Sequence, residues 1–421
     1  MSNNFKVIIV APFWRNPPHV GIYRIDRFVR WLSTQGVNIT LVRAGSTDQV
    51  QQMSWGVEVT VRDPLELYGD PVAGGGYTTP TRRPNRLRRF AAYLLFNPDP
   101  TVVWAKRAAY HPLVLEHGQG ATCVLSSNPP ESSHVASSLL AKQLQTDLIV
   151  DMRDGWLDEP LKPLLQHFRW QRWREGRLET PILRQAKHIF VSSVVWKDLL
   201  ENRLPFTKGK TTVLTNGYPP ESLRPAPTGK KCTAFNRITL LYAGQFTGSR
   251  NTRKVQYLLK PLLEGIQCSQ SKGDVVLLGN LEEDDLTEVN HWKPQLEARG
   301  WSVVVQSSVP RLELLERLHQ ADGLLLLSVS PATIPSKLFE YLTSGRPILC
   351  LTPEGSALWQ LGESLPQVFL LDDSQHQKVA SIVKDFLAVC VVENLHYEIP
   401  PDFTEESLSK IFLQELGLAN T

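Results

Sequence analysis

Three side chains within five residues, Ser336, Lys337 and Glu340, are of the types that hold a nucleotide. They lie in the stretch PATIPSKLFEYLTSGRPIL. A helix that begins at Ser336 would present free backbone N–H groups, a hydroxyl and an ammonium in its first turn, and all three favour an anion. One turn further, the Glu340 carboxylate could accept hydrogen bonds from two adjacent sugar hydroxyls, as acidic residues do for ribose in other nucleotide folds. An anion beside a diol indicates a nucleotide.

The same stretch is also compatible with an ordinary capped helix. In that interpretation Ser336 caps the helix, Lys337 is solvated and Glu340 completes a capping box. A capping box needs a spacing of three residues, whereas Ser336 and Glu340 are four apart. Leu338 is expected in the core beside this site, and Gly345 ends the helix before the next strand.

A second candidate anion site follows an apolar strand in LLYAGQFTGSRNTRK. Glycines such as Gly244 after a strand let the backbone approach a ligand, and arginines such as Arg250 give bidentate phosphate contacts. The segment lacks the glycine and lysine order of a P-loop, and the chain shows no GxGxxG that opens a helix. The alternative is a glycine turn with solvated arginines.

The elements that must position these residues alternate between short apolar runs and segments with helical periodicity. This alternation predicts mostly parallel sheets that are covered on both faces. A Pro-, Gly- and charge-rich connector, TNGYPPESLRPAPTGKKCTAFNR, interrupts it. We therefore expect an α/β protein with two doubly wound, Rossmann-like domains that face a cleft, residues 1–217 and 218–400. Residues 401–421 are expected to form a C-terminal helix that packs back on the first domain. In such sheets ligands bind beyond the carboxyl ends of the strands.

Bulk composition excludes several classes of protein. The 421 residues are 42% hydrophobic and 21% charged, as in ordinary globular proteins, and the formal net charge of +3 does not predict nucleic-acid binding. The five scattered cysteines lack metal-ligand spacing and are typical of free thiols in a reducing compartment. The longest apolar runs are far shorter than the ~20 residues of a membrane span. We expect a cytoplasmic protein, with an N-terminus that leaves no room for a signal peptide.

Five motifs in order resemble one known family. PSKLFEYLTSGRPIL, LLYAGQFTGSR, VLTNGY, VPRLELLERLHQADGLLLL and VDMRDGW are similar to those of GT-B fold, family 4 type nucleotide-sugar glycosyltransferases of bacterial cell-surface polysaccharide pathways. The resemblance implies a transferase of hexosyl type that moves a sugar from a UDP or GDP donor, held by the second domain, to an acceptor hydroxyl, held by the first. It implies a retaining, metal-independent reaction without a cofactor.

The resemblance also assigns roles to individual donor-site residues. Arg250 and Lys337 would neutralise the diphosphate, the Ser336 end of the helix would contact it, and Glu340 would bind the ribose. Further donor contacts are placed at five positions, which are Gly21, Gly244, Lys254, Leu338 and the base-binding loop ending at Arg311. The family usually carries a second glutamate eight positions before the ribose one, but this chain has Ala332, which puts the sugar contact and the stereochemistry in doubt.

Two loops after strands of the first domain are the candidate acceptor site. In DLIVDMRDGWLDE, Asp154 is a candidate for orienting the acceptor hydroxyl or stabilising positive charge on the sugar, flanked by Arg153 and Trp156. In SSNPPESSH, Asn128 and Glu131 are candidate acceptor contacts, whereas His134 fits a helix start. The alternative for Arg153 is an ion pair that holds the loop. The acceptor itself, a glycan, a lipid-linked molecule or a small molecule, is open.

Residues 82–96, RRPNRLRRFAAYLLF, join five arginines to an apolar segment. Such a segment can lie on an anionic membrane, with a binding free energy of about 1 kcal/mol per basic residue. The alternative is a solvated basic loop before a core helix.

Two other functions stay open for the chain. One is a nucleotide-sugar epimerase, and the other is a non-catalytic homologue that binds a nucleotide sugar and acts as a scaffold, which Ala332 keeps possible.

Overall fold

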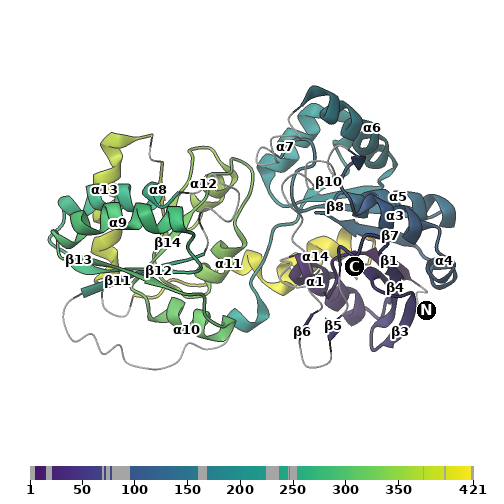
Figure 1. Cartoon of the computed structure of the whole chain (residues 1–421), viewed down its shortest axis with the longest axis horizontal. Helices are drawn as coiled ribbons and strands as arrows, with labels where there is room; N and C mark the ends of the chain where they lie inside the picture. The colour runs from purple at the N-terminus through teal and green to yellow at the C-terminus, as the bar shows by residue number, and fades with distance from the viewer. Residues whose placement is uncertain are drawn as a thin grey trace. The chain divides into compact units, whose positions relative to one another are not determined.

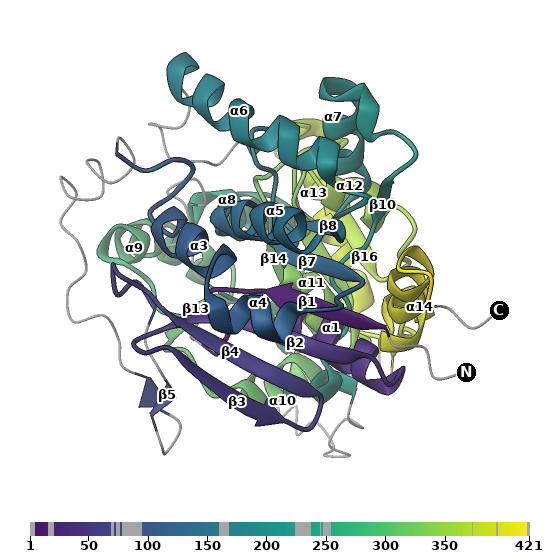
Figure 2. The ribbon, with the colours of Figure 1, turned by 90° about the vertical axis from the view of Figure 1, so that its right-hand side faces the viewer.

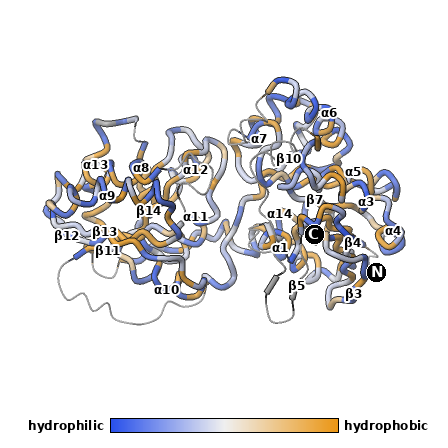
Figure 3. Tube along the Cα trace, viewed as in Figure 1, coloured by the Kyte–Doolittle hydropathy of each residue, from blue (hydrophilic) through white to orange (hydrophobic). Residues whose placement is uncertain are grey.

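The computed structural model describes residues 5–15, 21–68, 71–72, 76–77, 95–159, 168–223, 237–244, 246, 254–372, 374–392 and 395–418. Backbone contacts divide the chain into two units. Unit 1 consists of Met1–Thr215 together with Leu408–Thr421, and unit 2 of Asn216–Ser407. Figure 1 shows both units, and hydrophobic stretches alternate with hydrophilic ones along the chain in each (Figure 3).

Unit 1 is built on an eight-stranded sheet with the order β10-β9-β8-β7-β1-β2-β4-β3. All neighbouring strands are parallel except β3 and β4. The strands are β1 (Lys6–Val10), β2 (Asn38–Gly45), β3 (Gln49–Met53), β4 (Gly56–Arg62), β7 (Cys123–Ser127), β8 (Asp147–Met152), β9 (His188–Val191) and β10 (Thr211–Val213). A two-stranded ribbon pairs β5 (Pro71–Val72) with β6 (Gly76–Tyr77). The chain order changes direction between β1 and β7.

The helices of unit 1 follow the strands and cover the sheet (Figure 2). They are α1 (Gly21–Thr34), α3 (Val102–Ala109), α4 (Pro112–Gly118), α5 (Ser132–Leu144), α6 (Arg169–Gln185), α7 (Val194–Arg203) and η2 (Pro205–Thr207). The last helix, α14 (Glu405–Glu415), belongs mainly to this unit although it ends the chain. Its Phe412 ring is fully buried and stacks on Phe28 of α1 at a centroid distance of 4.6 Å.

Unit 2 holds a six-stranded, fully parallel sheet with the order β13-β12-β11-β14-β15-β16. The strands are β11 (Arg237–Ala243), β12 (Lys272–Leu278), β13 (Trp301–Gln306), β14 (Gly323–Leu327), β15 (Ile348–Leu351) and β16 (Val368–Leu371). The helices are η3 (Pro220–Leu223), α8 (Gln256–Gln267), α9 (Glu283–Glu297), α10 (Arg311–Gln320), α11 (Ser336–Leu342), α12 (Ala357–Gly362), α13 (His376–Cys390) and η5 (Pro401–Phe403). The chain order changes direction between β11 and β14.

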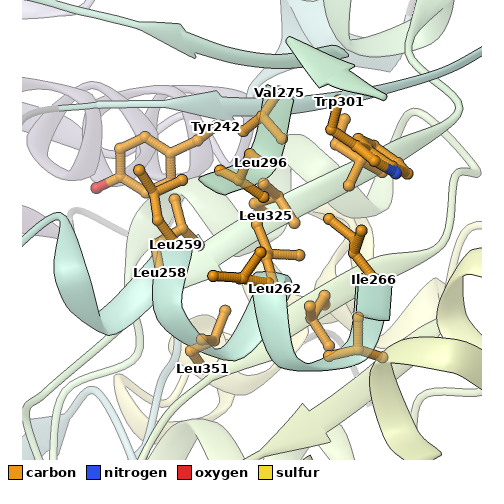
Figure 4. Packing of buried hydrophobic residues seen from close by; sticks show 14 of the residues in the cluster. Tyr242, Leu258, Leu259, Leu262, Ile266, Val275, Leu296, Trp301, Leu325 and Leu351 are labelled. Atoms are coloured by element: carbon orange, nitrogen blue, oxygen red, sulfur yellow. The ribbon is translucent and has the colours of Figure 1, made fainter. Parts of the chain in front are cut away.

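The core of unit 2 lies between α8 and the sheet (Figure 4). Leu258, Leu259 and Leu262 of α8 recur at helical spacing and are fully buried. They face apolar side chains of the strands, among them Val275 and Leu325, which are also fully buried. Because the strands are covered on both faces, they carry continuous apolar runs rather than an alternating pattern. The predicted fold class of two doubly wound parallel sheets is confirmed.

Within the described part of the chain, no helix combines the length and apolar character required to cross a membrane.

Candidate functional site

A pocket of about 180 Å³ opens in unit 2 at the carboxyl ends of β11 and β12, beside α11. Its walls come from the two strand ends, the loop after β13, and the helices α10 and α11. The lining residues are Ala243, Gly244, Leu278, Gly279, Asn280, Ser308, Val309, Leu314, Lys337, Glu340 and Tyr341.

The position of the pocket follows from the topology of the sheet. The helix after β11 leads to β12 on one side, and the helix after β14 leads to β15 on the other, so the two connections diverge. This divergence leaves a crevice at the carboxyl ends of the central strands, where open α/β sheets bind their ligands. Lys337 and Glu340 enter the pocket because α11 starts beside this crevice.

Gly244 allows Lys337 to lie against the backbone at the end of β11. A Cβ atom added to Gly244 would lie 1.8 Å from Lys337 Nζ, and one added to Gly279 would lie 2.2 Å from the Gly244 carbonyl oxygen. The ammonium is also 5.8 Å from the centroid of the Tyr242 ring. Two glycine turns and a lysine are therefore packed at one wall of the pocket, where a side chain at either glycine would intrude.

Tyr341 ties α11 to the end of β11. Its hydroxyl accepts a hydrogen bond of 2.9 Å from the backbone N–H of Ala243. The side chain is 1% exposed, and burial raises the pKa of Tyr341, so the phenol is neutral at physiological pH. This bond holds the helix that carries Lys337 and Glu340 in register with the strand that ends at the pocket.

The Glu340 carboxylate pairs with Arg311 of α10 at 3.1 Å, and the two side chains are 14% and 30% exposed. Arg311 also lies 3.9 Å from Glu221 of η3. Sequence analysis assigned Arg311 and Glu340 to the donor site separately and missed their pairing, since they are far apart in the sequence and joined only by the packing of α10 on α11.

The start of α11 is not capped by a side chain. Pro335 occupies the cap position with φ −60° and ψ 132°, and no side-chain hydrogen bond caps the helix. The capping-box alternative for Ser336, Lys337 and Glu340 is therefore absent from the structure. Ser336 is exposed, and the Leu338 side chain is fully buried.

The other predicted donor residues lie in different places. Arg250 lies outside the described residues. Lys254 is exposed just before α8 and outside the pocket lining, and Gly21 is the buried first residue of α1 in unit 1. Ala332 is fully buried, and its backbone N–H donates to the Ser330 hydroxyl at 3.4 Å.

In unit 1, a buried ion pair lies at the end of β8. Arg24 of α1 donates through Nε and Nη2 to both oxygens of Asp151, at 2.7 and 2.6 Å, and Ser127 donates to the same carboxylate at 2.6 Å. Arg24 Nη2 also donates to the Leu214 carbonyl at 2.9 Å. Sequence analysis singled out the loop that follows this strand but missed Arg24; the available signal was an arginine between the apolar positions of α1.

The two candidate acceptor loops are bonded to each other. Asn128 donates to the Asp154 carbonyl at 3.0 Å and accepts from its backbone N–H at 3.4 Å. Asn128 is fully buried, as is Trp156, whose Nε1 donates to Glu175 at 3.0 Å. In this structure Asn128 and Trp156 support the loops, whereas Asp154 is half-buried.

The remaining acceptor candidates flank these loops. The Arg153 side chain is half-buried, and its carbonyl accepts from the Ser192 hydroxyl at 2.7 Å. Glu131 is half-buried at the cap position of α5. Burial, followed by the Glu131 charge, raises the pKa of nearby Asp99 to about 6. Negative charge is therefore concentrated beside the start of α5.

His134 lies in the first turn of α5 and is fully buried. Its Nδ1 shares a hydrogen bond of 2.7 Å with the Ser126 hydroxyl, and its Nε2 has no partner among the described residues. Burial lowers the pKa of His134 to about 4, against smaller opposing effects of Glu131 and Asp151. The imidazole is therefore neutral in the folded protein.

No cluster of three or more histidine, cysteine, aspartate or glutamate side chains suited to a metal ion occurs among the described residues.

Comparison with known proteins connects this geometry to a family. Residues 22–217 match the family model of the glycosyl transferase 4-like domain. A search of curated proteins finds no match.

Solved structures of similar fold span nearly the whole chain. A glycosyltransferase from Rickettsia africae is 12% identical with a TM-score of 0.56, and covers 99% of this chain and 99% of its own. HepE of Anabaena, in complex with UDP and glucose, is 11% identical with a TM-score of 0.58, and covers 99% and 100%. The catalytic domain of starch synthase IV from Arabidopsis thaliana, bound to ADP and acarbose, is 10% identical with a TM-score of 0.63, and covers 99% of both chains.

At these identities the structures establish the fold, while the family match identifies the domain. The expected resemblance is thereby confirmed: the chain has the GT-B fold of glycosyltransferases, and its residues 22–217 belong to the glycosyl transferase 4-like domain family.

Proposed function

We propose that this protein transfers a sugar from a nucleoside diphosphate sugar, of UDP or GDP type, to an acceptor hydroxyl. The observation that supports the donor is the pocket of unit 2, in which Lys337 and Glu340 stand on one helix at the switch point of the sheet. HepE and starch synthase IV, which share the fold, were solved with UDP and with ADP respectively. A cation and a carboxylate one turn apart suit a diphosphate and the ribose beside it.

Sugar transfer requires stabilisation of the nucleoside diphosphate as it leaves. When the bond between the sugar and the diphosphate breaks, negative charge grows on the diphosphate, and preorganised cations and N–H donors lower the barrier. Lys337 supplies such a cation at the pocket wall, and we assign Arg250 the same task. Ser336 contributes a backbone N–H group near the diphosphate, and Gly244, whose own N–H donates to the Leu278 carbonyl, leaves room for Lys337 at the pocket wall. Leu338 follows Lys337 in the same turn, and Lys254 and Gly21 complete the proposed donor contacts.

Glu340 binds the ribose while it remains paired with Arg311. An ionised carboxylate has about four acceptor sites, so one arginine leaves room for sugar hydroxyls. Arg311 orients the carboxylate, and the nearby Val309 offers an apolar surface to the base. Arg311 therefore acts on the ribose through Glu340, in addition to its place in the base-binding loop.

The acceptor is proposed to contact unit 1 near Asp154, Arg153 and Glu131. The half-buried Asp154 is positioned by Asn128, with Trp156 beneath the same loop. Asp154 is the proposed group that orients the acceptor hydroxyl or stabilises positive charge on the sugar, in a retaining, metal-independent reaction of polysaccharide or glycolipid synthesis.

A glycan, a small molecule or a lipid-linked molecule would serve as the acceptor.

The reaction is proposed to take place in the cytoplasm. The free thiols of Cys123, Cys268, Cys350 and Cys390 support a cytoplasmic location. The basic segment 82–96, proposed to contact a membrane, lies outside the described residues except for its last two.

Donor binding and turnover test the function. Calorimetry with UDP and GDP, and release of either nucleotide from a panel of donor sugars, are measured for the wild type, Lys337→Ala and Glu340→Ala. We expect at least about tenfold weaker binding for each variant, because hydrogen bonds to charged groups contribute about 1.5–3 kcal/mol. Lys378→Ala, an exposed lysine of α13, is the matched control. Unchanged nucleotide affinity in both pocket variants would refute the site.

One observation supports a second candidate, a non-catalytic nucleotide-sugar-binding scaffold. Position 332, where the family usually has a glutamate that meets the donor sugar, is a fully buried alanine. Donor binding without release of nucleotide on any glycan or lipid extract would favour it. The mass of the product distinguishes transfer from epimerisation, because an epimerase adds nothing to an acceptor.

A further inference from the structure

The helix α6 of unit 1 presents one face that is both aromatic and cationic. Trp170, Trp173, Arg177 and Arg184 recur at spacings of three, four and seven residues, which places them along one side of the helix. Trp170 and Trp173 are 44% and 59% exposed, and Phe168, just before the helix, is 53% exposed. In unit 1, α6 lies at the periphery (Figure 2). We name the side formed by Phe168, Arg169, Trp170, Trp173, Arg177 and Arg184 the α6 face.

The acidic residues of α6 point the other way. Glu175 and Glu179 are its two carboxylates, and both are fully buried. Glu175 accepts from Trp156, and Glu179 pairs with Arg203 at 2.7 Å. Both carboxylates of α6 therefore face the interior of unit 1, whereas the helix carries five arginines.

The arginines of the α6 face keep their positive charge available. Within the described part of the chain, no carboxylate pairs with Arg169, Arg177 or Arg184. The contacts between arginines and tryptophans on this helix are cation–π contacts. The Arg177 guanidinium lies 4.2 Å from the centroid of Trp173, and that of Arg174 lies 5.4 Å from Trp170. Such pairs shield the guanidinium from water in part without cancelling its charge.

These contacts favour a lipid surface over a glycan as the occupant. A sugar that stacks on tryptophan needs an open ring face, and an arginine lies over each ring. At the boundary between lipid headgroups and acyl chains, tryptophan contributes an apolar body and a polar edge, while arginine pairs with phosphate. The anionic headgroups of a bilayer complement the uncompensated positive charge.

We propose that the α6 face docks on an anionic phospholipid bilayer. The α6 face contains none of residues 82–96, and its proposal does not depend on the identity of the donor. The arginines attract the headgroups, and the tryptophans and Phe168 enter the interfacial region. A lipid-linked acceptor would then reach unit 1 by diffusion in the plane of the membrane rather than through solution.

The test is sedimentation of the full chain with vesicles of phosphatidylcholine alone and with added phosphatidylglycerol. The charge variant is Arg169→Gln, Arg177→Gln, Arg184→Gln, and the aromatic variant is Trp170→Ser, Trp173→Ser. We expect the charge variant to bind mixed vesicles about 100-fold more weakly, at about fivefold per arginine. The aromatic variant should lose about tenfold or more. The matched control, Lys272→Gln, Arg299→Gln, Lys378→Gln, removes three exposed charges from unit 2 and should bind as the wild type does.

Two further measurements keep the outcome decisive. Thermal melting of each variant shows whether the fold is retained, and binding to heparin reports affinity for a soluble polyanion. The proposal is overturned if the wild type does not bind anionic vesicles. It is equally overturned if both variants bind them as tightly as the wild type does, because the binding surface would then lie elsewhere, such as in residues 82–96. It is also overturned if the aromatic variant keeps full vesicle binding while heparin binding falls with charge, because a polyanion and not a bilayer would then be the partner.

Discussion

A side chain at Gly244 is predicted to expel Lys337 from its place at the pocket wall. In Gly244→Ala the new Cβ would lie 1.8 Å from Lys337 Nζ, and φ at this position is +155°, which L-residues rarely adopt. The clash involves the end of a flexible side chain, so it is relieved when the ammonium moves. The backbone strain costs about 1–3 kcal/mol of stability. Nucleotide binding loses the charged contact of Lys337, about 1.5–3 kcal/mol or about 10- to 150-fold in affinity.

Calorimetry with UDP or GDP measures this effect, at a temperature where the variant remains folded. Gly355→Ala is the matched control, because Gly355 also lies in unit 2 and has a positive φ of +73° with no atom within 4 Å of an added Cβ. It should lose stability from backbone strain but keep its affinity. The double variant Gly244→Ala, Lys337→Ala should bind no more weakly than Lys337→Ala alone, since both changes remove one contact. Wild-type affinity in Gly244→Ala, or additive losses in the double variant, would refute the reasoning.

Three further predictions concern stability, each measured by urea unfolding. Arg24→Met should cost about 3–5 kcal/mol, because it leaves Asp151 buried without its cation, and a loss below 1 kcal/mol would contradict the role of the pair. Tyr341→Phe should cost about 1–3 kcal/mol, because the Ala243 N–H loses its acceptor, and unchanged stability would show that the N–H finds another. The folded pKa of His134, about 4, lies below its unfolded value, so the unfolded state binds the proton first and stability falls as pH drops below about 6.5. From pH 7 to pH 5 this amounts to about 2 kcal/mol, which His134→Asn should abolish; an equal pH dependence in both proteins would disprove the assignment.

The fold class was predictable from local patterns. Apolar runs such as GLLLL at β14 are continuous because both faces of a parallel strand are covered. Most of these runs are followed by a segment whose apolar residues recur with helical periodicity. The alternation of these two patterns identifies the doubly wound sheet without knowledge of any contact. The end of α11 was equally local, because the backbone at Gly345 has φ +66°, which glycine adopts readily.

The pairs that shape the candidate sites were not predictable in this way. Arg311 and Glu340 meet because α10 packs beside α11, and Asn280 enters the pocket because β12 neighbours β11 in the sheet. Sequence analysis proposed Lys337 and Glu340 from helix spacing, which is local, but had no means to find an ion pair across two helices. Capping of α11 was an open alternative that depended on a hydroxyl rotamer and a backbone angle, neither of which the sequence specifies.

The sequence by itself determined the residue types at the strand ends and the order of strands and helices, because hydrophobic periodicity is a property of consecutive residues. Only the tertiary structure decided which of the polar residues are buried together. The Arg24–Asp151 pair shows the reason, since it joins the first helix to a strand 127 positions later. The energy of a buried ion pair depends on desolvation and on distances of a few ångströms, and both are set when the sheet closes the gap between distant segments.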